Sequence, residues 1–113
     1  MPIQEWSDKI LLADLQDDPN LVDDLNALLN EVERRTDVDV VLDFGQVNFI
    51  NSSNVSRLLK LRKIVTLNNG RKLRLCGINT QVWGVLLVTG LDKVFDFCDD
   101  VTSGLASLQL EGG

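Results

Sequence analysis

The feature that most constrains the fold is a regular alternation of strand-like and helix-like segments along the chain. The strand-like runs are residues 9–16, 38–44, 72–78 and 93–98, and the helix-like stretches are residues 17–35, 53–67, 79–90 and 99–108. Alternation at these lengths is typical of right-handed crossovers onto a largely parallel sheet. The sequence therefore predicts an α/β fold.

Two details refine this prediction. Residues 3–6 form a further short segment that can pair with the first strand through a turn at Ser7 and Asp8. The β-branched run at 38–44 is of the kind found in a central strand that is buried on both faces. With 113 residues, 44% hydrophobic and 25% charged, the chain has the size and composition of one ordinary globular domain.

The residue inventory excludes several classes of site. The chain has no histidine and two cysteines, Cys76 and Cys98. Ser-His and Cys-His nucleophile arrangements are therefore excluded, and four-ligand zinc sites cannot be supplied. Both cysteines lie in or beside apolar runs, so we expect free, structural thiols. Neither Gly-x-Gly-x-x-Gly nor Gly-x4-Gly-Lys-Ser/Thr occurs, which argues against a nucleotide-binding enzyme. We expect no catalytic residues, no metal and no cofactor.

Charge and hydropathy bear on location and partners. No apolar run approaches the roughly 20 residues that a membrane helix needs, and the acidic amino terminus lacks a signal-peptide pattern. We therefore expect a cytoplasmic protein without membrane insertion. Residues 1–45 carry twelve acidic and three basic side chains, whereas residues 46–80 carry seven basic and no acidic ones. The overall net charge of −6 argues against direct nucleic-acid binding. The basic block either solvates a helix or offers a patch to an acidic partner.

The stretch VNFINSSNVSRLL, residues 47–59, places two adjacent hydroxyls where a helix begins. Asn51 or Ser52 can accept the first free amide hydrogens of that helix, which is the ordinary capping role. The same position attracts anions, because unpaired amides and the positive end of the helix dipole point at it. A phosphate on Ser52 could thus be accepted without unfolding, and it would change the surface offered to a partner.

A helical projection divides the residues that follow into two faces. An apolar arc comprises Val55, Leu58, Leu59, Leu61 and Val65, and a solvent-facing arc comprises Ser53, Ser56, Arg57, Lys60 and Lys63. Arg62 projects into the apolar arc, where we expect it to extend to the sheet edge or pair with an acid. Ile64 is predicted on the polar side.

The stretch VVLDFGQVNFINSSNVSRLLKLRK, followed by GRKLRLCGINTQVWGVLLVTGLDKVFDFCDDVTSGL, resembles the STAS domain family, the anti-sigma-factor antagonists. The family pattern is a strand, then Asp-hydrophobic-x-x-Val-x-aromatic-hydrophobic, then Asp-Ser-Ser/Thr-Gly and a helix. The resemblance implies a single STAS domain over residues 1–113, with its core at about residues 9–108. It also implies a small mixed, largely parallel sheet with about four helices packed mainly on one face.

For function, the resemblance implies a regulatory protein-binding module that is not an enzyme. In the family, the serine directly after the aspartate is phosphorylated by a partner that is both kinase and anti-sigma factor, and that position is Ser52 here. Unphosphorylated members bind the anti-sigma factor and release the sigma factor, whereas phosphorylated members let go. The implied partner-binding residues around the phosphoacceptor are Asn51, Ser53, Asn54, Ser56, Arg57 and Lys60.

Two positions depart from the family pattern. Asn51 stands where the family usually has aspartate, which removes a charge beside the phosphoacceptor. Asn54 stands where it usually has glycine, and we expect its side chain to lie where a partner would approach the backbone. These departures favour an alternative in which the chain is a non-phosphorylated STAS docking subunit of a lipid-type ABC transporter or of a larger signalling complex.

Overall fold

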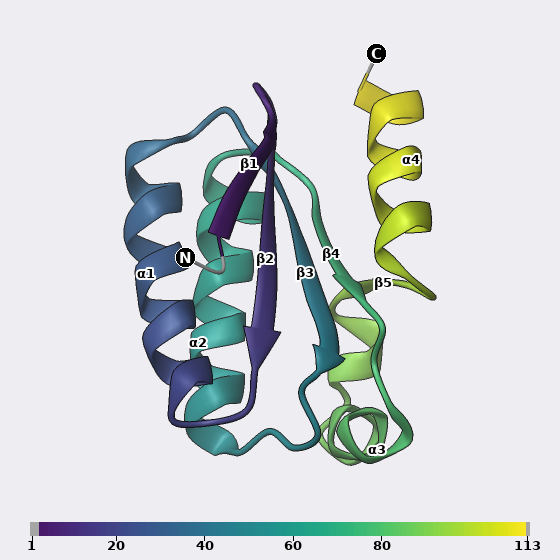
Figure 1. Ribbon diagram of the computed structural model, residues 1–113. Helices are drawn as coiled ribbons and strands as arrows, with labels where there is room; N and C mark the ends of the chain where they lie inside the picture. Colours follow the sequence, from purple (N-terminus) through teal and green to yellow (C-terminus); the bar gives the residue numbers. More distant parts are fainter. Residues whose placement is uncertain (1–2, 113) are drawn as a thin grey trace.

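The computed structural model describes residues 3–112, which form one five-stranded sheet and its helices (Figure 1). The strands, in sheet order, are β1 (Ile3–Ser7), β2 (Ile10–Gln16), β3 (Asp39–Gln46), β4 (Leu73–Cys76) and β5 (Asp96–Cys98). Strand β1 runs antiparallel to β2, and the other neighbours are parallel. The predicted α/β class and the mixed, largely parallel sheet are confirmed, as is the pairing of the amino-terminal segment.

Four α-helices connect or follow the strands. They are α1 (Asn20–Arg34), α2 (Ser52–Arg62), α3 (Thr80–Val88) and α4 (Val101–Gly112), with a π-helix η1 (Lys63–Asn68) after α2 and a 3₁₀ turn η2 (Leu91–Lys93) after α3. Successive right-handed crossovers between neighbouring strands place their helices on one face. Accordingly α1 and α2 lie on one side of the sheet and α4 on the other (Figure 1). The predicted packing of the helices mainly on one face is confirmed.

The core has two parts because β3 is buried on both faces. Val40, Leu42 and Phe44 point into the main cluster, which also contains buried residues of α1, α2 and α3. Val41 points the other way, into a small cluster beneath α4. This alternation is the two-sided burial expected for a central strand.

Helix α1 follows its sequence pattern closely. The buried residues are Leu21, Leu25, Leu28, Leu29 and Val32, which recur at three- and four-residue spacing as one stripe. Helix α3 lies within the predicted helix-like stretch 79–90. It begins after Asn79 and ends just before Gly90, whose φ of 76° lies in the left-handed region that glycine adopts readily.

The second helix departs from its predicted course. It begins at Ser52 and continues as a π-helix from Lys63, where Asn69 N–H donates to Ile64 O at 2.9 Å. The buried residues of α2 are Asn54, Leu58 and Leu61, so the face on the sheet is rotated from the predicted arc. Ile64, predicted on the polar side, packs against the main core, and Leu59, predicted in the apolar arc, is 38% exposed. Arg62 donates to the carbonyl of Val94 at 3.1 Å rather than pairing with an acid.

Other boundaries differ slightly. The last strand, predicted over residues 93–98, comprises only Asp96–Cys98, because Lys93 belongs to η2 and Val94 and Phe95 form the turn that follows it. Both cysteines are free, with Cys76 buried and Cys98 half-buried. Across residues 3–112, we find no helix with the length and apolar character needed to cross a membrane. No group of three or more acidic or cysteine side chains in that range is placed to hold a metal ion.

Candidate functional site at the start of α2

The predicted site lies where the carboxyl ends of the parallel strands meet. The loops from β2 to α1, from β3 to α2 and from β4 to α3 gather at this edge of the sheet, at the bottom of Figure 1. In α/β proteins this edge is where ligand and partner sites commonly form, because the loops can vary while the sheet stays rigid.

Two asparagines cap α2 reciprocally. Asn51 Oδ1 accepts a hydrogen bond from Asn54 N at 2.9 Å, and Asn54 Oδ1 accepts one from Asn51 N, also at 2.9 Å. This is a capping box in which asparagine takes the place usually held by Glu or Gln. The predicted capping role of Asn51 is confirmed. Ser52 is the first helical residue and is not needed as a cap.

A carboxylate from another loop holds both cap residues. Asn51 Nδ2 donates to Asp18 Oδ2 at 3.1 Å, and Asn54 Nδ2 donates to Asp18 Oδ1 at 3.4 Å. Asp18 lies in the loop between β2 and α1 and also accepts the backbone N–H of Val22 at 3.1 Å. Position 51 thus lacks an acidic side chain, yet a negative charge contacts this residue from a neighbouring loop.

Asp17, the residue before Asp18, holds the part of the loop from β3 to α2 that precedes Asn51. Its carboxylate accepts hydrogen bonds from Asn48 N at 2.8 Å, Asn48 Nδ2 at 2.9 Å and Phe49 N at 3.3 Å. These donors, led by the backbone N–H of Asn48, lower the pKa of Asp17 below its usual value. We call Asp17 and Asp18 the aspartate clamp, since together they hold the loop from β3 to α2.

The two serines have different surroundings. The Ser53 hydroxyl accepts a hydrogen bond from Arg57 Nη1, which also donates to Ser53 O at 3.2 Å. Arg57 Nε donates to Asn26 Oδ1 on α1 at 2.9 Å, so this guanidinium is anchored between helices. Ser52 is exposed, and within residues 3–112 its hydroxyl makes no hydrogen bond. Of the adjacent pair, Ser52 therefore presents the free hydroxyl.

The structure brings most of the predicted partner-binding residues to one surface. Asn51, Ser53, Ser56 and Lys60 are exposed, and Arg57 is half-buried. Asn54 is the exception, because it is fully buried and its amide completes the cap. The expectation that Asn54 adds a side chain to the partner-facing surface is therefore not met.

The basic block is partly structural. Arg71 Nε lies 3.1 Å from Asp39 Oδ1, and Arg74 Nη1 lies 3.2 Å from Asp96 Oδ2. These two arginines support the sheet rather than a patch at α2. Lys60 remains exposed on α2, so the basic surface near the serines is smaller than the sequence indicates.

Sequence reasoning missed two parts of the site. Phe49 is 61% exposed in the loop before Ser52, although an aromatic residue there reads as part of an apolar run. Exposed aromatic side chains are enriched at protein interfaces. Asp17 and Asp18 open the helix-like stretch predicted over residues 17–35, and that prediction does not connect them to the loop before Ser52. The adjacent acids before Pro19 were the available signal, but their contacts lie 31 to 36 residues away along the chain.

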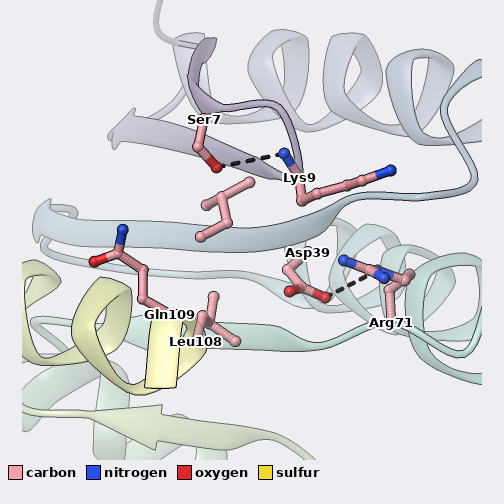
Figure 2. Close-up of a pocket in the computed structure, with 7 residues that line it drawn as sticks. Ser7, Lys9, Asp39, Arg71, Leu108 and Gln109 are labelled. Atoms are coloured by element: carbon pink, nitrogen blue, oxygen red, sulfur yellow. Dashed lines mark hydrogen bonds and ion pairs between the residues drawn. The ribbon is translucent and has the colours of Figure 1, made fainter. Parts of the chain in front are cut away.

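A separate hollow lies at the opposite edge of the sheet, between the turn from β1 to β2 and the end of α4 (Figure 2). Its volume is about 380 Å³, and Lys9, Asp39, Arg71 and Gln109 are among its lining residues. Because it adjoins the amino ends of β2 and β3, it is not part of the Ser52 site.

Comparisons with solved structures find the same fold in bacterial regulators. An anti-sigma-factor antagonist (STAS) domain protein from Planctomyces limnophilus is 17% identical, with a TM-score of 0.77 over 88% of this chain and 91% of that one. A Moorella thermoacetica RsbS variant is 18% identical, with a TM-score of 0.78 over 100% of both chains. The Bacillus cell fate determinant SpoIIAA in its phosphorylated form is 14% identical, with a TM-score of 0.71 over 94% and 96%.

At these identities the structural likeness concerns the fold. Among curated proteins, none matches the sequence significantly. The model of the STAS domain family matches residues 20–104, which span most of the chain and include the capped start of α2. The protein therefore belongs to the STAS domain family.

Proposed function

We propose that this STAS domain is an anti-sigma-factor antagonist, a regulatory protein-binding module that phosphorylation of Ser52 switches. The observation that carries the proposal is the exposed, unengaged hydroxyl of Ser52 at the first position of α2, beside a cap built entirely from other residues. The proposal is supported by the STAS assignment and by structural relatives described as anti-sigma-factor antagonists. One of these, SpoIIAA, is also known in a phosphorylated form.

Ser52 suits the role of phosphoacceptor because its hydroxyl takes no part in the cap of α2. A phosphate there would add nearly two negative charges at the positive end of the α2 dipole, which favours anions. It would also stand next to Asn51, whose amide contacts the Asp18 carboxylate. The fold keeps its cap, while the surface around Ser52 gains a strong negative charge. Such a change alters partner choice through electrostatic complementarity.

The partner in this proposal is an anti-sigma factor with serine-kinase activity, in the cytoplasm. The γ-phosphoryl group of ATP passes to Ser52 Oγ, the bond to ADP breaks, and a base of the kinase takes the hydroxyl proton. The STAS domain supplies only the hydroxyl and the docking surface, so it is not itself an enzyme. We assign that surface to Asn51, Ser53, Ser56, Arg57 and Lys60, with Phe49 as its aromatic member.

The test is to incubate the protein with its cognate kinase and ATP and to map phosphate by mass spectrometry. We expect modification at Ser52, no modification in Ser52→Ala, and wild-type modification in Ser53→Ala, whose hydroxyl is held by Arg57. Phosphate on Ser53 alone, or a loss of partner binding on kinase treatment that is as large for Ser52→Ala as for the wild type, would overturn the switch.

A second candidate keeps the fold without the switch. Asn51 replaces the usual acid and Asn54 fills the space beneath the loop, so the motif is tied into a static cap. In this reading the chain is a constitutive docking subunit of a lipid-type ABC transporter or of a larger signalling complex. Affinity capture discriminates the two, because recovery of a transporter ATPase supports docking and recovery of a small kinase-type ATPase supports the switch.

A further inference from the structure

Cys76 and Cys98 meet at one point beneath α4, on the face of the sheet opposite α1 and α2. They are register partners in the neighbouring parallel strands β4 and β5. A Cβ atom placed on Gly104 of α4 would lie 2.7 Å from Cys76 Sγ and 3.7 Å from Cys98 Sγ. Both sulfur atoms therefore lie against the same residue of the helix. Neighbouring strands lie about 4.8 Å apart, which is within the Cα separations of about 4.4–6.8 Å that a disulfide spans.

The two thiols differ in access. Cys76 is fully buried, whereas Cys98 is half-buried and lines a hollow of about 240 Å³ together with Ile78, Trp83, Phe97 and Asp99. Burial, and then the neighbouring Cys98 thiol, raise the pKa of Cys76 to about 12. Cys76 is therefore a protonated thiol at neutral pH, and Cys98 is the sulfur that a reagent from solvent reaches first.

We propose that Cys76 and Cys98 are an oxidation site, at which a hydroperoxide converts two contacting thiols into an intramolecular disulfide that loosens α4. In the first step Cys98 sulfur attacks the peroxide, the O–O bond breaks, and Cys98 sulfenic acid and one water form. In the second step Cys76 sulfur attacks Cys98 sulfur while the Cys76 proton passes to the departing hydroxyl, so the S–S bond forms, the S–O bond breaks and a second water leaves. Two thiols are oxidised while one hydrogen peroxide is reduced to two waters.

The reason for an effect on α4 is the contact with Gly104. This glycine lets the helix rest directly on the sulfurs, and a methyl group there would clash with Cys76. A disulfide requires a bond of about 2.05 Å and a dihedral angle near 90°, so both sulfurs leave their thiol positions. The cluster beneath α4 is small. Among the residues whose burial is described, its buried members are Ile10, Val41, Cys76, Leu105 and Leu108, with Leu12, Cys98 and Val101 packed against them. Because the sulfur atoms beneath Gly104 move when the disulfide forms, α4 packs less tightly against the sheet.

The test treats the full chain with hydrogen peroxide and analyses the intact mass and a non-reducing peptide map. We expect the loss of two hydrogen atoms, one cross-link between the peptides of Cys76 and Cys98, and full reversal by a thiol reductant. Cys98→Ser should remove the cross-link and leave Cys76 unmodified. Cys76→Ser should give a Cys98 sulfenic acid that a dimedone-type reagent traps. Unreacted thiols, only intermolecular disulfides, or wild-type Cys98 advancing to the sulfinic acid without a cross-link would each overturn the site.

Hydrogen exchange tests the coupling to α4 separately. Oxidation should speed exchange of the amides near Leu105 and Leu108 several-fold, and α1 amides serve as the internal control. Gly104→Ala, kept reduced, should produce the same change, because its methyl group displaces the helix mechanically. Unchanged exchange in oxidised, cross-linked protein would overturn the effect on α4. Neither measurement depends on the role of Ser52.

Discussion

Helices α2 and α3 begin at the same edge of the sheet, and their starts look alike at first. Each follows an asparagine, Asn51 or Asn79, whose Oδ1 accepts the N–H of the third helical residue, at 2.9 and 2.8 Å respectively. Each opens with an exposed hydroxyl residue, Ser52 or Thr80. By local sequence alone, both positions are equally suited to carry an anion.

The difference lies in what holds the cap. The amide group of Asn79 donates to the neutral backbone carbonyl of Val47 at 3.0 Å. The amide group of Asn51 donates to the carboxylate of Asp18, and the buried Asn54 returns a second bond to the cap. The start of α2 is therefore coupled to a charge in another loop, whereas the start of α3 is bound to uncharged backbone. The same cap motif therefore has different electrostatic surroundings at the two helix starts. Variants at both caps test this difference.

The largest expected effect comes from removing the buried amide. Asn54→Ala leaves the backbone N–H of Asn51 without its partner and opens space beneath the loop, so we expect a loss of about 2–3 kcal/mol in the free energy of unfolding. Asn79→Ala removes an ordinary cap and should cost about 1 kcal/mol. Urea unfolding followed by circular dichroism measures both. Equal losses would mean that the buried Asn54 amide contributes no more to the free energy of unfolding than the ordinary cap at Asn79.

The next effect concerns pH. Hydrogen bonds from Asn48 and Phe49 lower the folded-state pKa of Asp17 below the usual 3.8. The stabilisation is therefore fully present above the unfolded-state pKa and is lost as pH falls through the folded-state value. Asp17→Asn should make the loss of stability below about pH 4 less steep. The control is Asp23→Asn, an exposed acid in the first turn of α1. Superimposable acid-unfolding curves for wild type and Asp17→Asn would show that the ionised Asp17 carboxylate does not stabilise the folded protein.

The smallest effect compares the two hydroxyl positions directly. Thr80→Glu places an acid at a helix start and should stabilise the protein by about 0.5 kcal/mol. Ser52→Glu should gain less, because the added carboxylate lies in the neighbourhood of Asp18. Thermal unfolding at low ionic strength resolves this difference, and high salt should reduce it. Equal gains at the two positions would show that Asp18 does not act on a charge at Ser52.

Local patterns predicted much of this molecule. The cap at Asn51 depends on residues within three positions of each other, and it is confirmed. The helix-like stretches at 17–35 and 79–90 contain α1 and α3. The alternation of strands and helices predicted the sheet, since parallel neighbours require crossovers. The choice of Ser52 over Ser53 came from the family pattern, and the structure adds a physical reason in the hydrogen bond from Arg57 to Ser53.

What sequence could not show depends on distant contacts and on helix geometry. Asp17 and Asp18 bind a loop more than thirty residues away, and no local rule connects them to it. The burial of Asn54 follows from that contact and from the reciprocal cap. Ile64 was placed on the wrong side, because the apolar arc was taken to include Val55 and Leu59, whereas the buried stripe of α2 is centred on Asn54, Leu58 and Leu61.

The central claim is that a phosphate on Ser52 controls partner binding. The most direct measurement is the affinity of the cognate anti-sigma factor for three forms of the protein, by isothermal titration calorimetry. These are the unmodified chain, the chain with phosphoserine at position 52, and a control with phosphothreonine at position 80. We predict tight binding of the unmodified chain, weaker binding by at least about tenfold (roughly 1.4 kcal/mol) for the first modified form, and little change for the control. Equal affinities of the unmodified and Ser52-phosphorylated proteins would contradict the account.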